Sequence, residues 1–303
     1  MKRAFYTLDV FTDTPLSGNP LAVVIDCNGL DSARMQKIAG EFNLSETVFV
    51  LEPRDPVNTA RIRIFTPTRE LPFAGHPTVG TAVLLAQLRA PGMMLARDLG
   101  VMIEEQVGVL SCTVRQIRGQ APKASFIVPQ LPHPDGVPAT DALIAAALGL
   151  NIGDIGFDNH VPTVFSGGVP YTCVPVASLA AMARAKPMAS GWGHAFGGNT
   201  HRSAYLYTRE VVQAGSAFHT RMFFPLTTLV EDPATGSAAA AFAGVVMHFD
   251  HPEPGDHTLI LEQGFEMGRP SLITLGLDVA DGALASASIG GSAVIVSQGT
   301  IDL

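Results

Sequence analysis

The chain contains several short polar groups whose residue types could handle a proton or bind an anion. A carboxylate shielded from water has a raised pKa, so it can remove a proton from a substrate and return it elsewhere. Histidine and aspartate beside it could hydrogen-bond substrate groups or assist the proton transfer. This chemistry is that of an isomerase that needs no cofactor. The candidate residues are Asn19, Glu46, Gly75, His76, Asp232, Thr235, Gly236 and Ser237.

Each candidate also has a purely structural interpretation. Glu46 could be a solvated carboxylate at the end of a strand, and His76 could be a helix-start residue satisfied by backbone groups. Asp232 could serve only as an acid that stabilises a helix N-terminus. Ser237 could be a small packing residue and Asn19 a turn former. These interpretations stay open until the candidates are seen together in the whole chain.

An internal repeat favours the functional interpretation. Three short segments recur in the same order, at offsets of 158, 156 and 157 residues. They are Arg63-Ile64-Phe65-Thr66-Pro67 with Arg221-Met222-Phe223-Phe224-Pro225, Val79-Gly80-Thr81-Ala82 with Thr235-Gly236-Ser237-Ala238, and Glu105-Gln106-Val107-Gly108 with Glu262-Gln263-Gly264. The repeat predicts two related halves, with His76 and Asp232 each beside a helix start. We expect these two residues on opposite walls of one cleft, with Glu46 lining it.

The elements that must position these residues are two helices at 78–88 and 235–247. Both are apolar on nearly every face, so each must be enclosed by other structure. In β-rich halves the simplest enclosure is a curved or barrel-like sheet wrapped around the helix. Small residues in the first turn let an anion such as a carboxylate approach the free N–H groups. The fold class predicted is therefore α+β, with two similar lobes.

The remaining pattern places the boundary between the lobes. Four prolines between 129 and 138 exclude a helix or central strand there, so this segment is the predicted linker. The first lobe then spans 1–128 and the second begins at 129. Asp31 is the expected cap of a helix at 31–41, and 101–106 with 109–115 form a predicted hairpin. The segments 293–296 and 300–303 read as a final strand pair.

Composition narrows the class of partner. The 303 residues are 47% hydrophobic and 15% charged, which suits two well-packed domains. A net charge of −8 without a lysine or arginine run argues against nucleic acid as a partner. No apolar run reaches the roughly 18 residues that a membrane span needs. The three scattered cysteines are typical of reduced thiols in a cytoplasmic protein.

Motifs for other chemistries are missing from the sequence. It has no GxSxG elbow, no P-loop and no strand-linked GxGxxG, so neither a serine hydrolase nor a nucleotide enzyme is indicated. His248, His251 and His257 lie among prolines and glycine, as in a polar surface loop, without the spacing of a helical metal site. We therefore expect neither a metal nor a cofactor.

Long motifs in this chain resemble the signature blocks of the PhzF family, the phenazine-biosynthesis-like isomerases. The matching blocks are Ser-Gly-Asn-Pro-Leu-Ala-Val-Val (17–24), Asn-Leu-Ser-Glu-Thr-Val-Phe-Val (43–50), Thr-Pro-Thr-Arg-Glu-Leu-Pro-Phe-Ala-Gly-His-Pro-Thr-Val-Gly-Thr-Ala (66–82) and Glu-Asp-Pro-Ala-Thr-Gly-Ser-Ala (231–238). The resemblance implies a diaminopimelate-epimerase-like fold and a homodimer. It also implies that a C-terminal strand at 293–303 returns to the first lobe, which leaves 129–292 as the second lobe.

The resemblance also implies roles for particular residues. Glu46 matches the family's acid/base, and His76, Asp232 and Ser237 match its substrate-contacting positions, with glycines beside them at the helix starts. The implied reaction is a proton shift in a small cyclic or unsaturated carboxylate, similar to the isomerisation of trans-2,3-dihydro-3-hydroxyanthranilate. Two-cysteine racemisation is not expected, since neither helix-start loop contains cysteine.

Two alternatives remain open at this point: a cofactor-independent epimerase or racemase, and a non-catalytic protein that binds small anions. Two departures from the family pattern leave the substrate's shape unspecified. Residues 226–230 lack the Gly-Ile expected before Glu231, and the glycine-rich segment 187–202 is unusually long.

Overall fold

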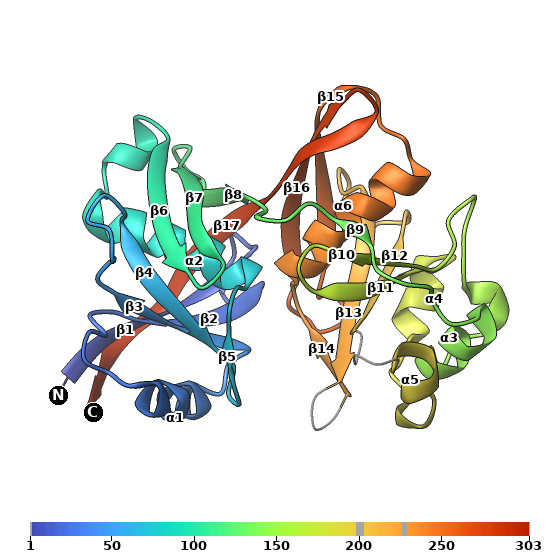
Figure 1. Ribbon diagram of the computed structural model, residues 1–303, viewed down its shortest axis with the longest axis horizontal. Helices are drawn as coiled ribbons and strands as arrows, with labels where there is room; N and C mark the ends of the chain where they lie inside the picture. The colour runs from blue at the N-terminus through green and yellow to red at the C-terminus, as the bar shows by residue number, and fades with distance from the viewer. Residues whose placement is uncertain (1, 198–202, 226–228, 303) are drawn as a thin grey trace. The chain divides into compact units, whose positions relative to one another are not determined.

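The computed structural model describes residues 2–197, 203–225 and 229–302, and the chain forms two compact units (Figure 1). Unit 1 comprises Met1–Pro129 and Ile289–Leu303, and unit 2 comprises Gln130–Ser288. The division expected from the sequence has its boundaries at 128/129 and 292/293. Two segments that depart from the family pattern, 198–202 and 226–228, lie outside the described residues.

The strands of unit 1 pair in a closed ring. They follow one another in the order β17–β1–β2–β3–β4–β6–β7–β8, and β8 pairs with β17 again. Their bounds are β1 (Lys2–Val10), β2 (Asn19–Val24), β3 (Glu46–Leu51), β4 (Ala60–Phe65), β6 (Leu99–Glu105), β7 (Gly108–Arg115), β8 (Lys123–Ile127) and β17 (Ala283–Asp302). A short strand, β5 (Glu70–Leu71), adds to β4. Closure of the ring gives each of its eight strands a neighbour on both sides.

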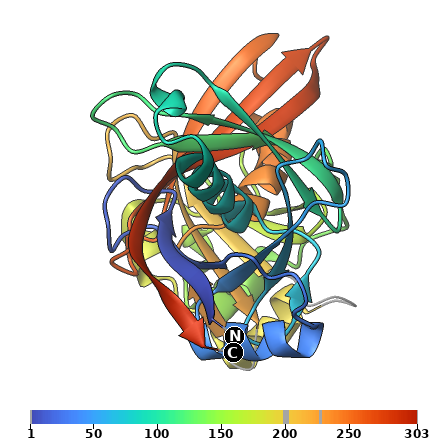
Figure 2. The same cartoon turned by 90° about the vertical axis from the view of Figure 1, so that its left-hand side faces the viewer.

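Helix α2 (Gly75–Arg89) fills this barrel, as Figure 2 shows in teal. Every residue from Gly75 to Ala86 is buried, and the helix contacts strands on all sides of the ring. The expected barrel-like sheet around an apolar helix is therefore confirmed. The helix begins at Gly75, three residues before the predicted start at 78, and it includes Pro77 in its first turn. A proline there loses no intrahelical hydrogen bond.

Helix α1 (Ser32–Phe42) covers the outer face of the barrel at β3 and β4. Asp31 caps it as expected, and its side chain accepts a hydrogen bond of 2.7 Å from the backbone N–H of Arg34. Asn43 ends the helix in the left-handed conformation. Apolar residues of α1, including Met35 and Ile38, pack against the outward-facing side chains of these strands. A short 3-10 helix, η1 (Met93–Leu95), precedes β6.

Unit 2 repeats the strand order of unit 1. Its order is β9–β10–β11–β12–β13–β15–β16–β17, with β14 added to β13. The bounds are β9 (His133–Pro134), β10 (Thr163–Ser166), β11 (Pro170–Pro175), β12 (Ser203–Thr208), β13 (Phe218–Pro225), β14 (Leu229–Asp232), β15 (Gly255–Gln263) and β16 (Ser271–Ala280). Helix α6 (Gly236–Phe249) packs against these strands in the place that α2 has in unit 1.

The other helices of unit 2 form a second layer. They are α3 (Asp141–Leu148), η2 (Ile152–Asp154), α4 (Leu179–Arg184) and α5 (Ala189–Phe196). Trp192 and Phe196 of α5 enter an apolar cluster with residues of α3, α4 and β12. The described part of the glycine-rich segment thus belongs to the core of unit 2. No helix among the described residues is long and apolar enough to span a bilayer.

The structure corrects the register of the repeat. Phe65 pairs with Glu70 where Phe223 pairs with Glu231, so the 158-residue offset at Arg63 is confirmed. After this hairpin the offset becomes 161 residues, because seven residues separate Phe223 from Glu231 whereas four separate Phe65 from Glu70. The predicted match of 79–82 with 235–238 is therefore wrong, since Gly75 corresponds to Gly236. The third match is off by one residue.

The prediction of a final strand pair at 293–296 and 300–303 is also wrong, since β17 is one continuous strand. Gly299 does not turn the chain but pairs with Phe5 of β1. A Cβ atom at Gly299 would lie 2.8 Å from the ring of Phe5, so glycine lets this ring cover the strand. The register ends with Lys2 opposite Asp302, and the two termini lie side by side (Figures 1 and 2).

Candidate active site

Glu46 and His76 lie together in unit 1. Glu46 is the first residue of β3, and His76 is the second residue of α2. The carboxylate atom Oε2 of Glu46 is 3.3 Å from Nε2 of His76, with side-chain exposures of 17% and 6%. One end of the barrel therefore holds an acid whose carboxylate is still reachable and an imidazole that is almost enclosed.

His76 is neutral in this position. Burial disfavours the imidazolium and lowers the pKa of His76 to about 3. The positive end of the α2 dipole opposes a cation there as well. A neutral imidazole can donate a hydrogen bond to a carboxylate through its N–H or accept one from a carboxylic acid at its other ring nitrogen. His76 can thus hold Glu46 in either protonation state without a net change of charge.

The other unit 1 candidates frame this pair. Asn19 begins β2 opposite Val10 and is fully buried. Leu21, two residues further along β2, pairs with Glu46. Gly75 is the first residue of α2, and the N-cap residue Ala74 makes no side-chain bond to this described helix start. The backbone donors of the first turn are therefore not covered by a cap.

The unit 2 candidates gather before helix α6. Asp232 ends β14 and Thr235 is the N-cap of α6. The Thr235 hydroxyl donates to Oδ2 of Asp232 at 2.5 Å. Gln263 clamps the same loop, because its Nε2 donates to the Asp232 carbonyl at 2.8 Å and to the Thr235 hydroxyl at 3.1 Å. This network fixes the entry to the helix and orients the Asp232 carboxylate.

Ser237 has a partner that sequence reasoning missed. Its hydroxyl lies 2.7 Å from the hydroxyl of Tyr171, a residue of β11 with 4% exposure. The two residues are 66 positions apart, so no local pattern links them. Ser237 follows Gly236 at the start of α6, just as His76 follows Gly75 at the start of α2. The first turns of the two buried helices thus present different polar side chains from equivalent positions.

A buried acid behind α2 was also missed as a functional group. Thr78 of α2 lies 2.6 Å from Oε1 of Glu105, and burial raises the pKa of Glu105 to about 8. In unit 2 the position of Glu105 is taken by Gln263, which contacts the N-cap residue Thr235 instead of a residue inside the helix. A neutral amide in the matching place agrees with a protonated Glu105 at neutral pH.

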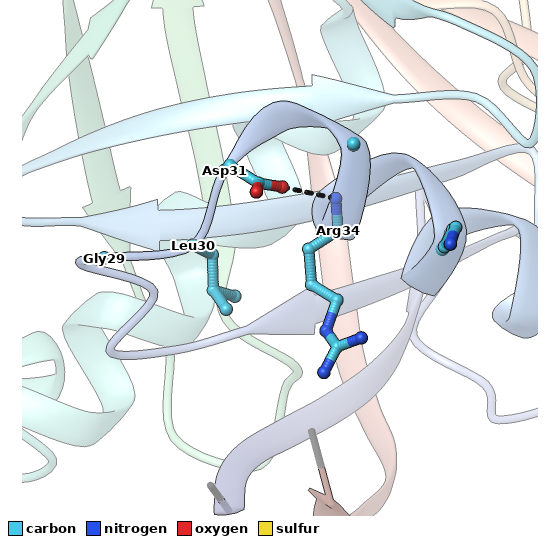
Figure 3. A pocket seen from close by; sticks show the side chains of 6 residues that line it. Gly29, Leu30, Asp31 and Arg34 are labelled. Carbon is cyan, nitrogen blue, oxygen red and sulfur yellow. Dashed lines mark hydrogen bonds between the residues drawn. The ribbon is translucent and has the colours of Figure 1, made fainter.

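A surface hollow at the start of α1 contains none of these residues. Gly29, Leu30, Asp31 and Arg34 are among its lining residues (Figure 3). Asp31 is engaged as the helix cap there. This hollow is therefore separate from Glu46 and His76. The expected placement of His76 and Asp232 on opposite walls of one cleft stays a prediction.

Comparison with known proteins identifies the family. The model described as "Phenazine biosynthesis-like protein" (PhzC-PhzF) matches residues 8–299. The chain belongs to this family. It is 50% identical to the uncharacterized isomerase mll1393 of Mesorhizobium japonicum, over 99% of this chain and 98% of that protein. It is 35% identical to the trans-2,3-dihydro-3-hydroxyanthranilate isomerase of Pseudomonas fluorescens, over 99% of each chain.

A solved structure agrees with this membership. The PhzF-family phenazine biosynthesis protein of Bacillus anthracis superposes with a TM-score of 0.88 at 27% identity, covering 100% of both chains. The protein described here, as a member of this family, is therefore an isomerase. The alternative of a non-catalytic protein that binds small anions no longer applies.

Proposed function

We propose that this isomerase moves a proton between two carbons of a small cyclic or unsaturated carboxylate, with Glu46 as the acid and base. The observation that carries the proposal is the contact of 3.3 Å between Glu46 and a neutral, buried His76. The relatives named trans-2,3-dihydro-3-hydroxyanthranilate isomerase support a substrate of this chemical class.

The proposed step balances without a cofactor. The Glu46 carboxylate takes a proton from one carbon while the electron pair of that C–H bond enters the conjugated system. The resulting carboxylic acid returns the proton to another carbon, and the double bond moves. His76 stabilises the acid and the carboxylate in turn, since a neutral imidazole can accept from one and donate to the other.

The remaining candidates are proposed to bind the substrate. The first turns of α2 and α6 offer backbone N–H groups and a positive dipole to a carboxylate. Ser237 and Asp232 offer a hydroxyl and a carboxylate to hydroxyl or amino groups of the substrate. That both half-sites serve one substrate stays a prediction. A double-mutant cycle in turnover between His76→Asn and Ser237→Ala tests it, and fully additive losses would contradict it.

Cysteine chemistry does not offer another route. Cys27, Cys112 and Cys173 are buried and unpaired. Burial raises the pKa of Cys27 and Cys112 to about 12, and it raises the pKa of Cys173 as well. Thiols with such pKa values cannot act as bases near neutral pH. A two-cysteine racemase mechanism therefore has no suitable residues.

Replacement of the acid tests the proposal. Glu46→Gln keeps the size and polarity of the side chain but removes the base. With trans-2,3-dihydro-3-hydroxyanthranilate as the probe, turnover should fall by about 10²–10⁴-fold while substrate binding is largely retained. Glu41→Gln, on the surface of α1, is the matched control and should leave turnover unchanged. Near-full turnover of Glu46→Gln on a substrate that the wild type converts would refute the role of Glu46.

We also propose that the protein is a cytoplasmic homodimer. The three reduced cysteines support a reducing compartment, and the dimer is expected from the family. A monomer mass by light scattering at micromolar concentration would contradict the dimer.

A further inference from the structure

The connection between β15 and β16 in unit 2 carries an acidic residue that the matching connection in unit 1 lacks. In unit 2 the connection 264–270 joins β15 to β16 and carries Glu266. The Glu266 carboxylate lies 2.9 Å from Nε2 of His219 and 3.9 Å from Nε of Arg221. Burial alone would lower the pKa of His219, but hydrogen bonds and charge from Glu262 and Glu266 outweigh it and raise the pKa to about 9. Unit 2 thus supplies its own carboxylate to two neighbouring cations.

Unit 1 has a cation at the same position without that carboxylate. Arg61 pairs with Glu104 across β4 and β6, where His219 pairs with Glu262 across β13 and β15. Glu104 accepts the backbone N–H groups of residues 54 and 55, and Glu262 accepts those of 212 and 213. The correspondence is therefore one of contacts as well as of strand order.

The cation next to Arg61 is repeated too. Arg63 makes a two-pronged contact with Glu70, at 2.7 Å and 2.5 Å. Arg221 makes the same contact with Glu231, at 2.8 Å in both prongs. The two arginines are thus already paired, and Glu266 is an additional acid that unit 2 alone provides.

No residue of unit 1 takes the place of Glu266. Strands β6 and β7 are joined by Gln106 and Val107 alone. Within the described part of the chain, Arg61 makes no ion pair, and its buried Nε atom has no hydrogen-bond partner. A pocket of about 440 Å³ lies here. Its lining includes Arg54, Arg61, Arg63, Glu70, Glu104 and Gln106.

The three acids that line this pocket, Glu70, Glu104 and Glu105, already have hydrogen-bond partners, which for Glu105 is Thr78 of α2. Glu70 accepts from Arg63 and from the Gln106 amide at 2.8 Å. Hydrogen bonds from the Asn58 side chain and from two backbone N–H groups lower the pKa of Glu104 to about 2. Burial raises the pKa of Glu105 to about 8, so Glu70 and Glu104 are the two ionised acids beside the three arginines, which leaves a surplus positive charge next to an unpartnered guanidinium N–H.

We propose that this pocket binds the carboxylate of a small organic acid, with Arg61 and Arg63 in the place that His219 and Arg221 have around Glu266. A guanidinium presents paired donors that match a carboxylate. The pocket volume suits a small ligand. Arg61 pairs with Leu51 at the far end of β3, about 17 Å along the strand from Glu46 at roughly 3.4 Å per residue. Arg61 is therefore remote from the proposed catalytic pair along this strand.

Side-chain NMR of the whole protein tests the proposal. The Nε–H resonance of Arg61, assigned by its loss in Arg61→Gln, should shift saturably when succinate is added at constant ionic strength. Resonances near the pocket, such as the Gln106 side-chain amide, report binding in the variants. Arg61→Gln should weaken succinate binding there by about 10- to 100-fold, the effect of losing a hydrogen bond to a charged group. Arg61→Lys should retain part of the affinity, because it keeps the charge.

The controls separate this site from general charge effects. Arg115→Gln removes an exposed arginine of β7 and should leave the affinity unchanged. Shifts that grow linearly with succinate, or succinate affinity that survives Arg61→Gln, would overturn the proposal. Equal affinity for inorganic phosphate would overturn the assignment to carboxylates. None of these readouts depends on turnover, so they are independent of the role of Glu46.

Discussion

Replacing Glu105 with glutamine is expected to make unit 1 more stable at alkaline pH. The Thr78 hydroxyl has a single proton, yet it lies 2.8 Å from the Ala74 carbonyl and 2.6 Å from Glu105. A protonated Glu105 satisfies both contacts, since it donates to Thr78 while Thr78 donates to Ala74. Its other oxygen, Oε2, is buried and has no hydrogen-bond partner among the residues that the structure describes, which a carboxylate would tolerate poorly.

The magnitude follows from the two pKa values. The pKa of Glu105 rises from 4.5 to about 8 on folding. Below pH 4.5 both states carry the proton and no stability is lost. As pH rises from 4.5 to 8, the unfolded chain releases the proton while the fold retains it, so wild type loses about 1.4 kcal/mol per pH unit. Between pH 5.5 and 7.5 the loss is about 3 kcal/mol, and the glutamine variant should not share it.

Hydrogen exchange of the buried amides of α2 is a suitable assay, because it reports the opening of unit 1 alone. Wild type and Glu105→Gln are compared at the same pH, so the intrinsic dependence of exchange on pH cancels. The difference in opening free energy should grow with pH and level off above pH 8.

A difference that stays constant across this range would show that Glu105 is ionised in the fold, and it would refute the reasoning. The reciprocal variant Gln263→Glu is the matched test in unit 2. It places a titratable acid beside Thr235 and should give α6 the pH dependence that α2 has lost.

Three further outcomes are expected. The Gly244→Ala variant should be less stable than the Gly193→Ala variant by about 1–3 kcal/mol in urea unfolding. The new Cβ at position 244 would lie 2.3 Å from the Phe165 ring, whereas the space around position 193 is open. Equal stabilities of the two variants would contradict this packing. The pKa of His219 is raised to about 9 in the folded state, so its cation stabilises unit 2 fully below pH 6.5, and this contribution of about 3 kcal/mol should be lost by pH 9. Hydrogen exchange of β13 amides in wild type and in His219→Gln measures the contribution. Opening free energies that change with pH in parallel in the two proteins would count against it. Tyr171→Phe should raise KM by up to about tenfold with little change in stability, since it removes one hydrogen bond to the α6 start; steady-state kinetics would show an unchanged KM if this contact has no role in binding.

The two buried helices and the sheets that enclose them could be predicted from the sequence. Helices apolar on every face require enclosure whatever the details of the fold, so α2 and α6 with barrel-like sheets could be foreseen. The cap at Asp31 depends on a local pattern and was equally readable. The duplication was visible in the sequence at Arg63 and Arg221. Both arginines form an ion pair with a glutamate across the same hairpin, which is a reason for the two halves to keep this residue.

Features that depend on long-range contacts were not readable. The hairpin of unit 2 has three extra residues between the paired Phe223 and Glu231, which shift the helix register, and no local signal marks them. Tyr171 reaches Ser237 only through the fold. Gly299 has the local signature of a turn, but pairing with Phe5 keeps it extended. In each case a tertiary partner decides what a short segment does.

The continuous strand β17 has a consequence for synthesis on the ribosome. The barrel of unit 1 needs residues 289–302, which emerge after the whole of unit 2, whereas unit 2 is complete at residue 288. At about 5–20 residues per second, the edges of β1 and β8 wait unpaired for roughly 10–35 s after residue 129 is made. Unpaired edges are templates for association with other chains. The N-terminal half is therefore the last to mature, and a chaperone that shields it would act on β1 and β8.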